Sequence, residues 1–254
     1  MGFFSTTIKP TIPIAQQIQS NTSHKAFAAA DLFFDWTAFD IPKGAARLVG
    51  VSILVRGVDG AANTARDFQL VFAKGDANGD APSSLGTENS TVDGVGWFNH
   101  ALGRLYINDT NYSQSIDTML VGTIGFGSST DHGPVSMVLQ GEPDSGTNVG
   151  YDKLYVAGIG GSSNTWAFQT NVAADGAVSD GAATDITVKT TDARNVFAVG
   201  DVIHVHDSET AIGTIKSIDD ATSIILESAN GVAIADDDEI MNANPITVIL
   251  SFEQ

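Results

Sequence analysis

Two neighbouring stretches with alternating apolar residues constrain the fold most. Residues 47–56 carry a branched aliphatic side chain at every second position from Val49 to Val55. Residues 67–74 repeat the alternation with large apolar residues from Phe68 onward. A period of two is typical of half-buried β-strands. Because a pair of strands is marginal by itself, we expect this pair to belong to a larger sheet stacked on another.

Further strand-like stretches continue the pattern and predict an all-β protein. They lie at 31–40, 97–107, 119–126, 135–139, 153–157 and 165–169. A long polar excursion at 75–96 separates the strands expected at 67–74 and 97–107, and a short helix is expected around 113–119. The number of strands suits an antiparallel, jelly-roll-like β-sandwich, which we assign to residues 26–170.

A second, smaller domain is expected toward the end of the chain. Residues 171–185 contain mostly Gly, Ala and Asp without bulky core residues, so they are predicted to be a linker. Residues 186–254 are predicted to form a small, acidic, barrel-like β domain. Its expected strands are 186–189, 202–206, 211–218, 223–227 and 246–252, with a hairpin turn at 219–222.

The first 25 residues are predicted to form an extended arm. Two prolines restrict this stretch to extended or edge conformations. The arm is either a frayed terminus or a segment that docks on a neighbouring subunit by strand addition. The residues expected at that interface are Ile8, Pro10, Ile12, Pro13 and Ile14.

The charge of the chain excludes several classes of function. The chain has 30 acidic and 12 basic residues, a net charge of −18, with −12 in residues 171–254 and −6 before them. Phosphate backbones and anionic lipids are bound by Lys and Arg, so neither a nucleic acid nor a membrane is an expected partner. The chain has no Cys, which excludes disulfides and thiolate metal sites. Neither a spanning helix nor a signal peptide is expected.

Two groups of residues have spacings that are compatible with a metal ion. Asp76, Asn78 and Asp80 resemble the start of a calcium loop, but the full loop pattern is not completed, and an ordinary turn is the favoured interpretation. His204 and His206 fall on one face of a strand, but no third ligand follows from the spacing, and a solvated face is favoured.

The sequence contains no pattern that specifies a reaction. It has no nucleophile elbow, phosphate-binding loop or dinucleotide fingerprint, so we expect no catalytic residues, no cofactor and no enzymatic activity. Trp36, Trp97 and Trp166 could form a sugar-binding platform, although aromatic residues at strand positions usually belong to a core.

The arm from Ile8 to Ile14, the Gly/Ala-rich sandwich and the terminal segment from Val199 to Leu250 together resemble tailed-bacteriophage virion proteins, particularly capsid decoration (cement) proteins. The resemblance implies a non-enzymatic protein, made in the host cytoplasm, that binds the major capsid protein on the outer surface of the virion. It also implies a homo-oligomer, often a trimer.

Two alternatives to this hypothesis remain. The first is a tail, baseplate or fibre component that contacts the host through loops at 75–96 or 128–150. The second is a carbohydrate-binding module or glycosidase.

Overall fold

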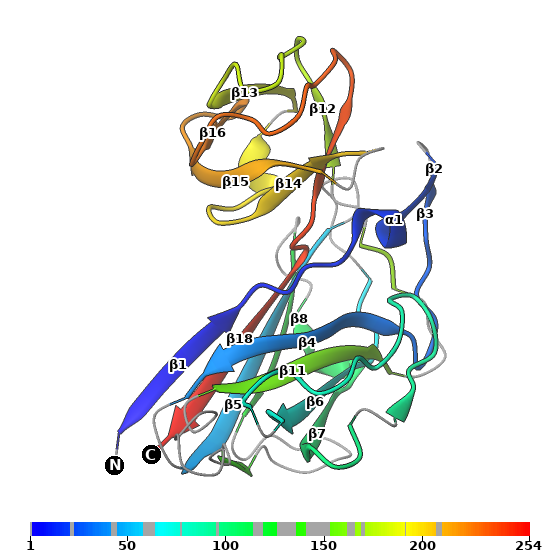
Figure 1. Cartoon of the computed structure of the whole chain (residues 1–254), viewed down its shortest axis with the longest axis vertical. Helices are drawn as coiled ribbons and strands as arrows, with labels where there is room; N and C mark the ends of the chain where they lie inside the picture. The colour runs from blue at the N-terminus through cyan, green and yellow to red at the C-terminus, as the bar shows by residue number, and fades with distance from the viewer. Residues whose placement is uncertain are drawn as a thin grey trace.

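The structure is a computed structural model of the whole chain. The structure describes residues 2–20, 23–41, 45–57, 64–76, 78–94, 97–113, 119–125, 136–140, 153–161, 166–168, 171–190, 192–206 and 210–254. Figure 1 shows a sandwich of two sheets with a small barrel at one end. Among the described residues, no helix has the length and apolarity needed to cross a bilayer.

The sandwich consists of a six-stranded and a four-stranded sheet, and every strand pair in both is antiparallel. The larger sheet has the order β1 (Phe3–Ile8), β18 (Ile246–Glu253), β5 (Ala45–Arg56), β9 (Met119–Gly125) and β8 (Tyr112–Ser113), and β10 (Met137–Gln140) also pairs with β5. The smaller sheet has the order β4 (Leu32–Asp40), β11 (Lys153–Gly160), β6 (Phe68–Lys74) and β7 (Ala101–Ile107).

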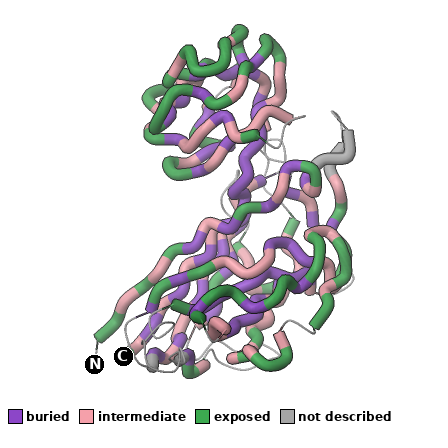
Figure 2. Tube along the Cα trace, in the orientation of Figure 1, coloured by how far each residue is buried: buried purple, intermediate pink, exposed green. Residues whose placement is uncertain are grey.

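A single apolar core fills the space between the two sheets. Figure 2 shows buried residues concentrated there and inside the barrel. At one end of this core, Phe33 contacts Phe27, Phe68 and Phe168 edge to face, with ring centroids 5.1–5.4 Å apart. Edge-to-face contacts of this kind stabilise aromatic clusters beyond the area that they bury.

The second unit is a closed barrel with its own core. Its strands follow the order β12 (Asn171–Ala174), β13 (Asp185–Lys189), β16 (Ser223–Leu226), β15 (Ala211–Ile218), β14 (Val202–Val205) and β17 (Glu239–Asn242). Ile218 pairs with Ile224 across the predicted 219–222 hairpin. The predicted fold class, an all-β protein with a β-sandwich and a small barrel-like domain, is therefore confirmed.

Two predicted strand placements were wrong. The strands at 47–56 and 67–74 do not pair with each other, because β5 belongs to the larger sheet and β6 to the smaller one. A ten-residue connection is longer than an ordinary hairpin loop, so it does not force its two flanking strands to be neighbours. The strand at 246–252 is also not part of the barrel: β18 lies between β1 and β5 and contributes Val248, Leu250 and Phe252 to the sandwich core.

The predicted domain boundaries shift accordingly. The 171–185 segment is not a linker, since β12 is a barrel strand whose Val172 and Ala174 point into the barrel core. Small residues suffice there because the interior of a six-stranded barrel is narrow. The 1–25 segment is not a separate arm, since β1 is a strand of the larger sheet. The barrel is thus inserted into the sandwich, and the chain returns to the sandwich at Ile246.

Short elements complete the fold. They are α1 (Ile14–Gln17), β2 (Ile18–Ser20), β3 (Ser23–His24) and two 3-10 turns at Asp109–Asn111 and Ala193–Asn195. Most of the helix predicted at 113–119 lies outside the described residues, while Ser113 and Met119 themselves are strand residues.

Candidate functional site

Asp76 and residues 78–80 are joined in a turn by their own hydrogen bonds. The Oδ1 atom of Asp76 accepts the backbone N–H groups of Asn78 at 2.8 Å and Asp80 at 3.0 Å. Gly79 has a φ of 80°, and its carbonyl accepts the Tyr155 hydroxyl at 2.7 Å. Burial, together with the charges of Asp80 and Asp76, raises the pKa of Tyr155. This is the side chain-to-backbone turn that the sequence favoured over a calcium loop.

The two histidines of the other metal hypothesis lie at the end of β14. His204 is within the strand, and the N–H group of His206, directly after it, donates to the Glu239 carbonyl at 2.8 Å. The neighbouring acidic residues, Asp207 and Glu209, lie outside the described residues. Among the residues that the structure describes, no three His, Cys, Asp or Glu side chains are grouped to hold a metal ion.

The residues expected at an intersubunit arm interface contact their own chain instead. Ile8 and Ile12 are buried in the sandwich core, while Ile14 packs against Met241 and Ala243 on the outside of the barrel. Pro10 is also buried, and Pro13 is half-buried. The segment therefore fills the junction between sandwich and barrel, and its apolar anchors are used within the molecule.

A network of buried polar side chains holds this junction together. The Nδ2 atom of Asn244 donates to the carbonyls of Lys9 at 3.2 Å and Pro10 at 3.1 Å. Its Oδ1 atom accepts the N–H group of Val202 at 2.8 Å. One side chain thus satisfies backbone groups of residues 9–10 and of β14.

An ion pair extends the network. The ammonium group of Lys9 lies 2.8 Å from Oδ1 of Asp201 and also donates to the Val199 carbonyl at 2.7 Å. The Oδ2 atom of Asp201 accepts hydrogen bonds from the side-chain amide of Asn242 and the backbone N–H of Ala198, each at 2.8 Å. Asp201 is only 2% exposed, and a carboxylate buried to this extent needs partners. The Lys9 ammonium and the two N–H donors supply them. The arrangement serves to orient the barrel on the sandwich.

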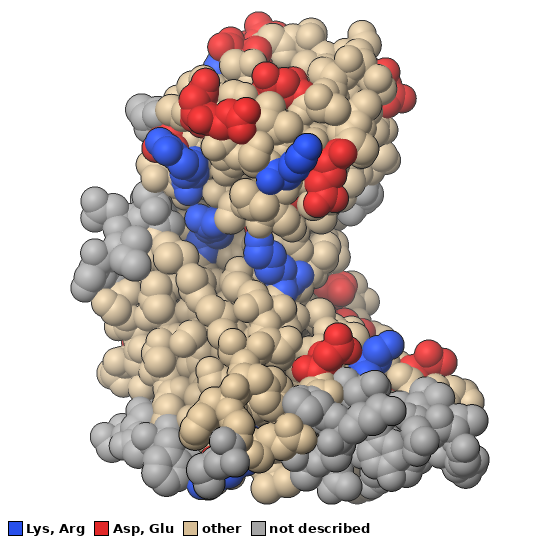
Figure 3. All heavy atoms as spheres, turned by 90° about the vertical axis from the view of Figure 1, so that its left-hand side faces the viewer, with Lys and Arg blue, Asp and Glu red and all other residues tan. Residues whose placement is uncertain are grey.

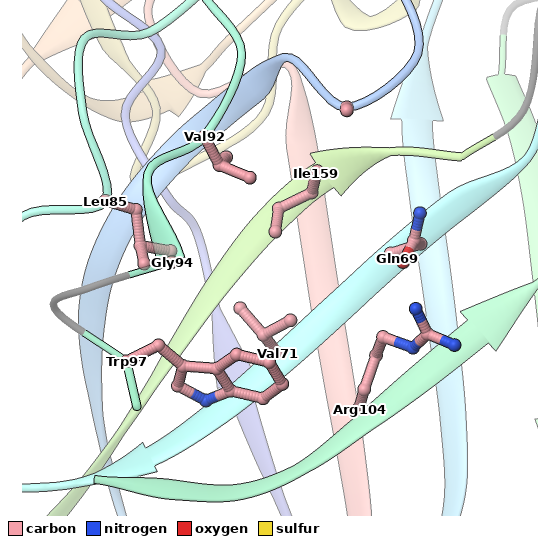
Figure 4. A pocket seen from close by; sticks show the side chains of 9 residues that line it. Gln69, Val71, Leu85, Val92, Gly94, Trp97, Arg104 and Ile159 are labelled. Carbon is pink, nitrogen blue, oxygen red and sulfur yellow. The ribbon is translucent and has the colours of Figure 1, made fainter. Parts of the chain in front are cut away.

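A cavity of about 310 Å³ lies on the outer face of the four-stranded sheet. Its floor is formed by Val71 of β6 and Ile159 of β11, and it is covered by Leu85, Val92 and Trp97 (Figure 4). Most of its surface is therefore apolar.

The covering segment 81–94 is tied to the start of β4. Leu32 donates to the Ser90 carbonyl at 2.9 Å, and Val92 donates to the Ala30 carbonyl at 3.0 Å. These hydrogen bonds give the cavity a defined wall. The loop predicted as a recognition loop at 75–96 is thus, in its described part, packed on the sheet. Most of the loop predicted at 128–150 lies outside the described residues.

Three polar groups border the cavity. The indole N–H of Trp97 donates to the Phe72 carbonyl at 3.0 Å, and the Nε2 atom of Gln69 donates to the Gly160 carbonyl at 3.2 Å. Arg104 lies opposite Val71 on the neighbouring strand, and its guanidinium makes no hydrogen bond or ion pair with any other described residue. An apolar cavity with an available cation at its rim suits a small ligand that carries an anionic or hydrogen-bonding group.

The tryptophans do not form a shared platform. Trp166 is 1% exposed in the sandwich core, whereas Trp36 and Trp97 are half-buried beside the outer apolar cluster. Gln69 and Arg104 were not predicted from the sequence to line a cavity. Alternation places them on the outer face of their strands, but nothing in the sequence shows that a distant loop encloses that face.

Comparison with known proteins adds no family to this description. No protein-family model matches the chain, and no curated protein matches it in sequence.

Proposed function

We propose that the chain is a non-enzymatic structural protein that decorates a bacteriophage capsid and stabilises it by binding the outer capsid lattice. The observation that carries this proposal is the segregation of charge. The barrel, residues 171–245, has 14 acidic and 3 basic residues, a net charge of −11, whereas the longer sandwich has a net charge of −7. Acidic side chains gather on the barrel in Figure 3, and much of the described sandwich surface in that view is uncharged.

This distribution suits a protein with an attached side and an outward side. The sandwich supplies a weakly charged surface for the major capsid protein. The barrel, oriented by the junction network, projects an acidic surface that disfavours contact with packaged DNA. Many copies on a repeating lattice bind with high avidity even where each single contact is weak.

Labelling of virions that contain the chain tests the proposal. An antibody against the barrel is expected to decorate the head, and stripping the protein from the head is expected to lower the temperature at which the shell opens. Label confined to the tail would instead favour a tail, baseplate or fibre component. Absence of the protein from virions would contradict both assignments.

The cavity at Trp97 favours host contact as a second candidate function. An apolar cavity beside a tryptophan face and the Arg104 guanidinium suits a sugar with an acidic group. We expect Trp97→Ala to abolish binding to an array of acidic glycans. Phe98→Ala is the matched control, because Phe98 is the next residue in the chain, is 84% exposed and does not line the cavity. Absence of binding by the unaltered protein would contradict this candidate.

A further inference from the structure

Among the described residues, no strand covers the outer edge of β1 in the six-stranded sheet. Strand β1 pairs with β18 along its whole length, from Phe3 opposite Glu253 to Ile8 opposite Val248. It is also the outermost strand of that sheet, and no other described residue pairs with its far side (Figure 1).

The hydrogen-bond pattern identifies which backbone groups face outward. Gly2 and Gln254 exchange two hydrogen bonds of 2.9 Å, so they form a hydrogen-bonded pair of the antiparallel ladder. Such pairs alternate along a ladder with non-hydrogen-bonded pairs. The even-numbered residues of β1 therefore bond to β18. The N–H and C=O groups of Phe3, Ser5 and Thr7 point away from the sheet.

This edge lacks the features that usually prevent strands from pairing. The sequence Phe-Phe-Ser-Thr-Thr-Ile contains no charged residue, Pro or Gly. By contrast, β4 carries Asp35 and Asp40, β7 carries Arg104, and β8 and β10 are short. Charges, prolines and short length are the ordinary protection of sheet edges, so an unprotected six-residue edge indicates a partner strand.

We propose that β1 pairs antiparallel with β1 of a second copy of this chain, about a two-fold axis that passes beside Ser5. In this register Ser5 lies opposite Ser5 of the second copy, and Phe3 lies opposite Thr7. The outward groups of one strand then meet the outward groups of the other, which forms about six hydrogen bonds. The two six-stranded sheets become one continuous sheet.

The side chains and charges agree with this register. Phe3 is 73% exposed, and in the dimer its ring lies beside the Thr7 side chain of the second copy, a favourable cross-strand pair. The charges that flank the edge are paired within the chain, Arg47 with Glu253 at 3.4 Å and Lys9 with Asp201 at 2.8 Å. Antiparallel pairing also places the two acidic barrels at opposite ends of the joined sheet.

Figure 3 views the molecule from the side on which β1 lies, and the middle of the described sandwich surface there carries no charge. Two molecules of charge −18 approach most readily through such a surface. The inference does not depend on the capsid role. A two-fold contact joins two copies, so the trimer implied by the resemblance would need a further surface.

Analytical ultracentrifugation of the full chain tests the dimer. At about 150 mM salt, where repulsion is screened over roughly 8 Å, we expect a species of twice the 26.5 kDa chain mass. Lower salt is expected to weaken the association. Ser5→Pro removes an outward N–H without touching a bond to β18 and is expected to weaken dimerisation at least about tenfold. Ser5→Ala keeps that N–H and should remain dimeric.

A charge pair tests the register independently of proline. Ser5→Lys alone and Ser5→Glu alone place like charges opposite each other and should dimerise less than the unaltered chain. A mixture of the two variants should restore the dimer. The proposal is overturned if the unaltered chain is monomeric at 100 µM, or if its oligomer survives a folded Ser5→Pro variant. A mixture that fails to associate would also overturn it.

Discussion

Tyr112 and Gly158 show how closely single residues of the sandwich are fitted. The Tyr112 ring packs against Trp166 at a centroid distance of 6.0 Å and lies over Gly122, where an added Cβ would be 2.5 Å from a ring carbon. At Gly158, an added Cβ would be 2.2 Å from the Phe34 ring. Glycine is required at both strand positions because an aromatic ring occupies the space of a side chain.

The hydroxyl group of Tyr112 is buried and has no hydrogen-bond partner among the described residues. Tyr112→Phe removes this unsatisfied group, so we expect it to raise the free energy of unfolding by up to about 1 kcal/mol near neutral pH. Thermal unfolding followed by circular dichroism measures the change. A clear loss of stability would show that the hydroxyl is bonded.

The same variant should change the response to alkaline pH. Burial, reinforced by Asp67, raises the pKa of Tyr112 well above its ordinary value. In the unfolded chain Tyr112 ionises at about pH 10, whereas in the folded chain it ionises only at a higher pH. Ionisation therefore favours the unfolded state, and stability that is present below about pH 10 is lost as the pH rises above it. Tyr112→Phe lacks this loss, and its advantage in melting temperature should widen between pH 9 and 11. A constant difference across that range would contradict the assignment.

Gly158→Ala tests whether the Phe34 ring leaves room for a side chain at position 158. The added methyl group must displace the Phe34 ring, which is 1% exposed, and we expect a loss of about 1–3 kcal/mol in urea unfolding. Gly176→Ser is unsuitable as a control because φ is 99° there. Gly94→Ala is suitable, since an added Cβ at Gly94 meets nothing within 4 Å. Partial rescue of Gly158→Ala by Phe34→Leu would identify the ring as the obstacle.

The position of a strand in the sequence was easier to predict than the strands with which it pairs. Alternation in β5, β6 and β18 predicts strands, and all three are strands. Alternation does not encode which sheet a strand joins, because residues on a core face look alike in either sheet. β12 was missed because it has only four residues and one of its two inward residues is Ala174, so the alternation is too short and too weakly apolar to predict a strand.

Among the candidate sites, too, local structure could be predicted and contacts between distant segments could not. Turn chemistry at Asp76 is local, so the sequence was sufficient to favour a turn. The junction network joins Lys9 to Asp201 and the cavity joins Leu85 to Ile159, and such long-range contacts depend on the topology. The junction network could not be derived without the positions of β1 and β18, and the cavity could not be derived without the pairing of β11 with β6.

Asn244→Ala probes the connection between the elements at the junction. It leaves the Val202 N–H and the carbonyls of Lys9 and Pro10 without their partner, so we expect a loss of about 2–3 kcal/mol in urea unfolding. Hydrogen exchange at the Val202 amide should accelerate as well. Asn78→Ala, on an exposed turn, is the matched control and should change stability by less than about 0.5 kcal/mol. Equal effects of the two variants would contradict a structural role for the network.

At the scale of the whole molecule, the barrel is an insertion with its own core. Its six strands form a closed barrel, so no barrel strand needs a strand of the sandwich as a partner. Within the part of the barrel that the structure describes, fourteen buried residues form a core separate from that of the sandwich. The two ends of the insertion lie side by side, because Asn171 pairs with Met241 across β12 and β17.

This arrangement predicts that the two units fold separately. A chain of residues 171–245 alone should give a dispersed amide NMR spectrum and a cooperative thermal transition. The transition should come at a lower temperature than in the whole protein, because a domain of this size is marginal and loses the contacts of Lys9 and Ile14. The complementary chain, with 171–245 replaced by a short Gly/Ser linker, should keep the sandwich, since β18 can still enter between β1 and β5. If the isolated barrel is unfolded while the linked sandwich is stable, the barrel depends on the junction for its fold. If both are unfolded, the molecule is one cooperative unit and the insertion has no independent core.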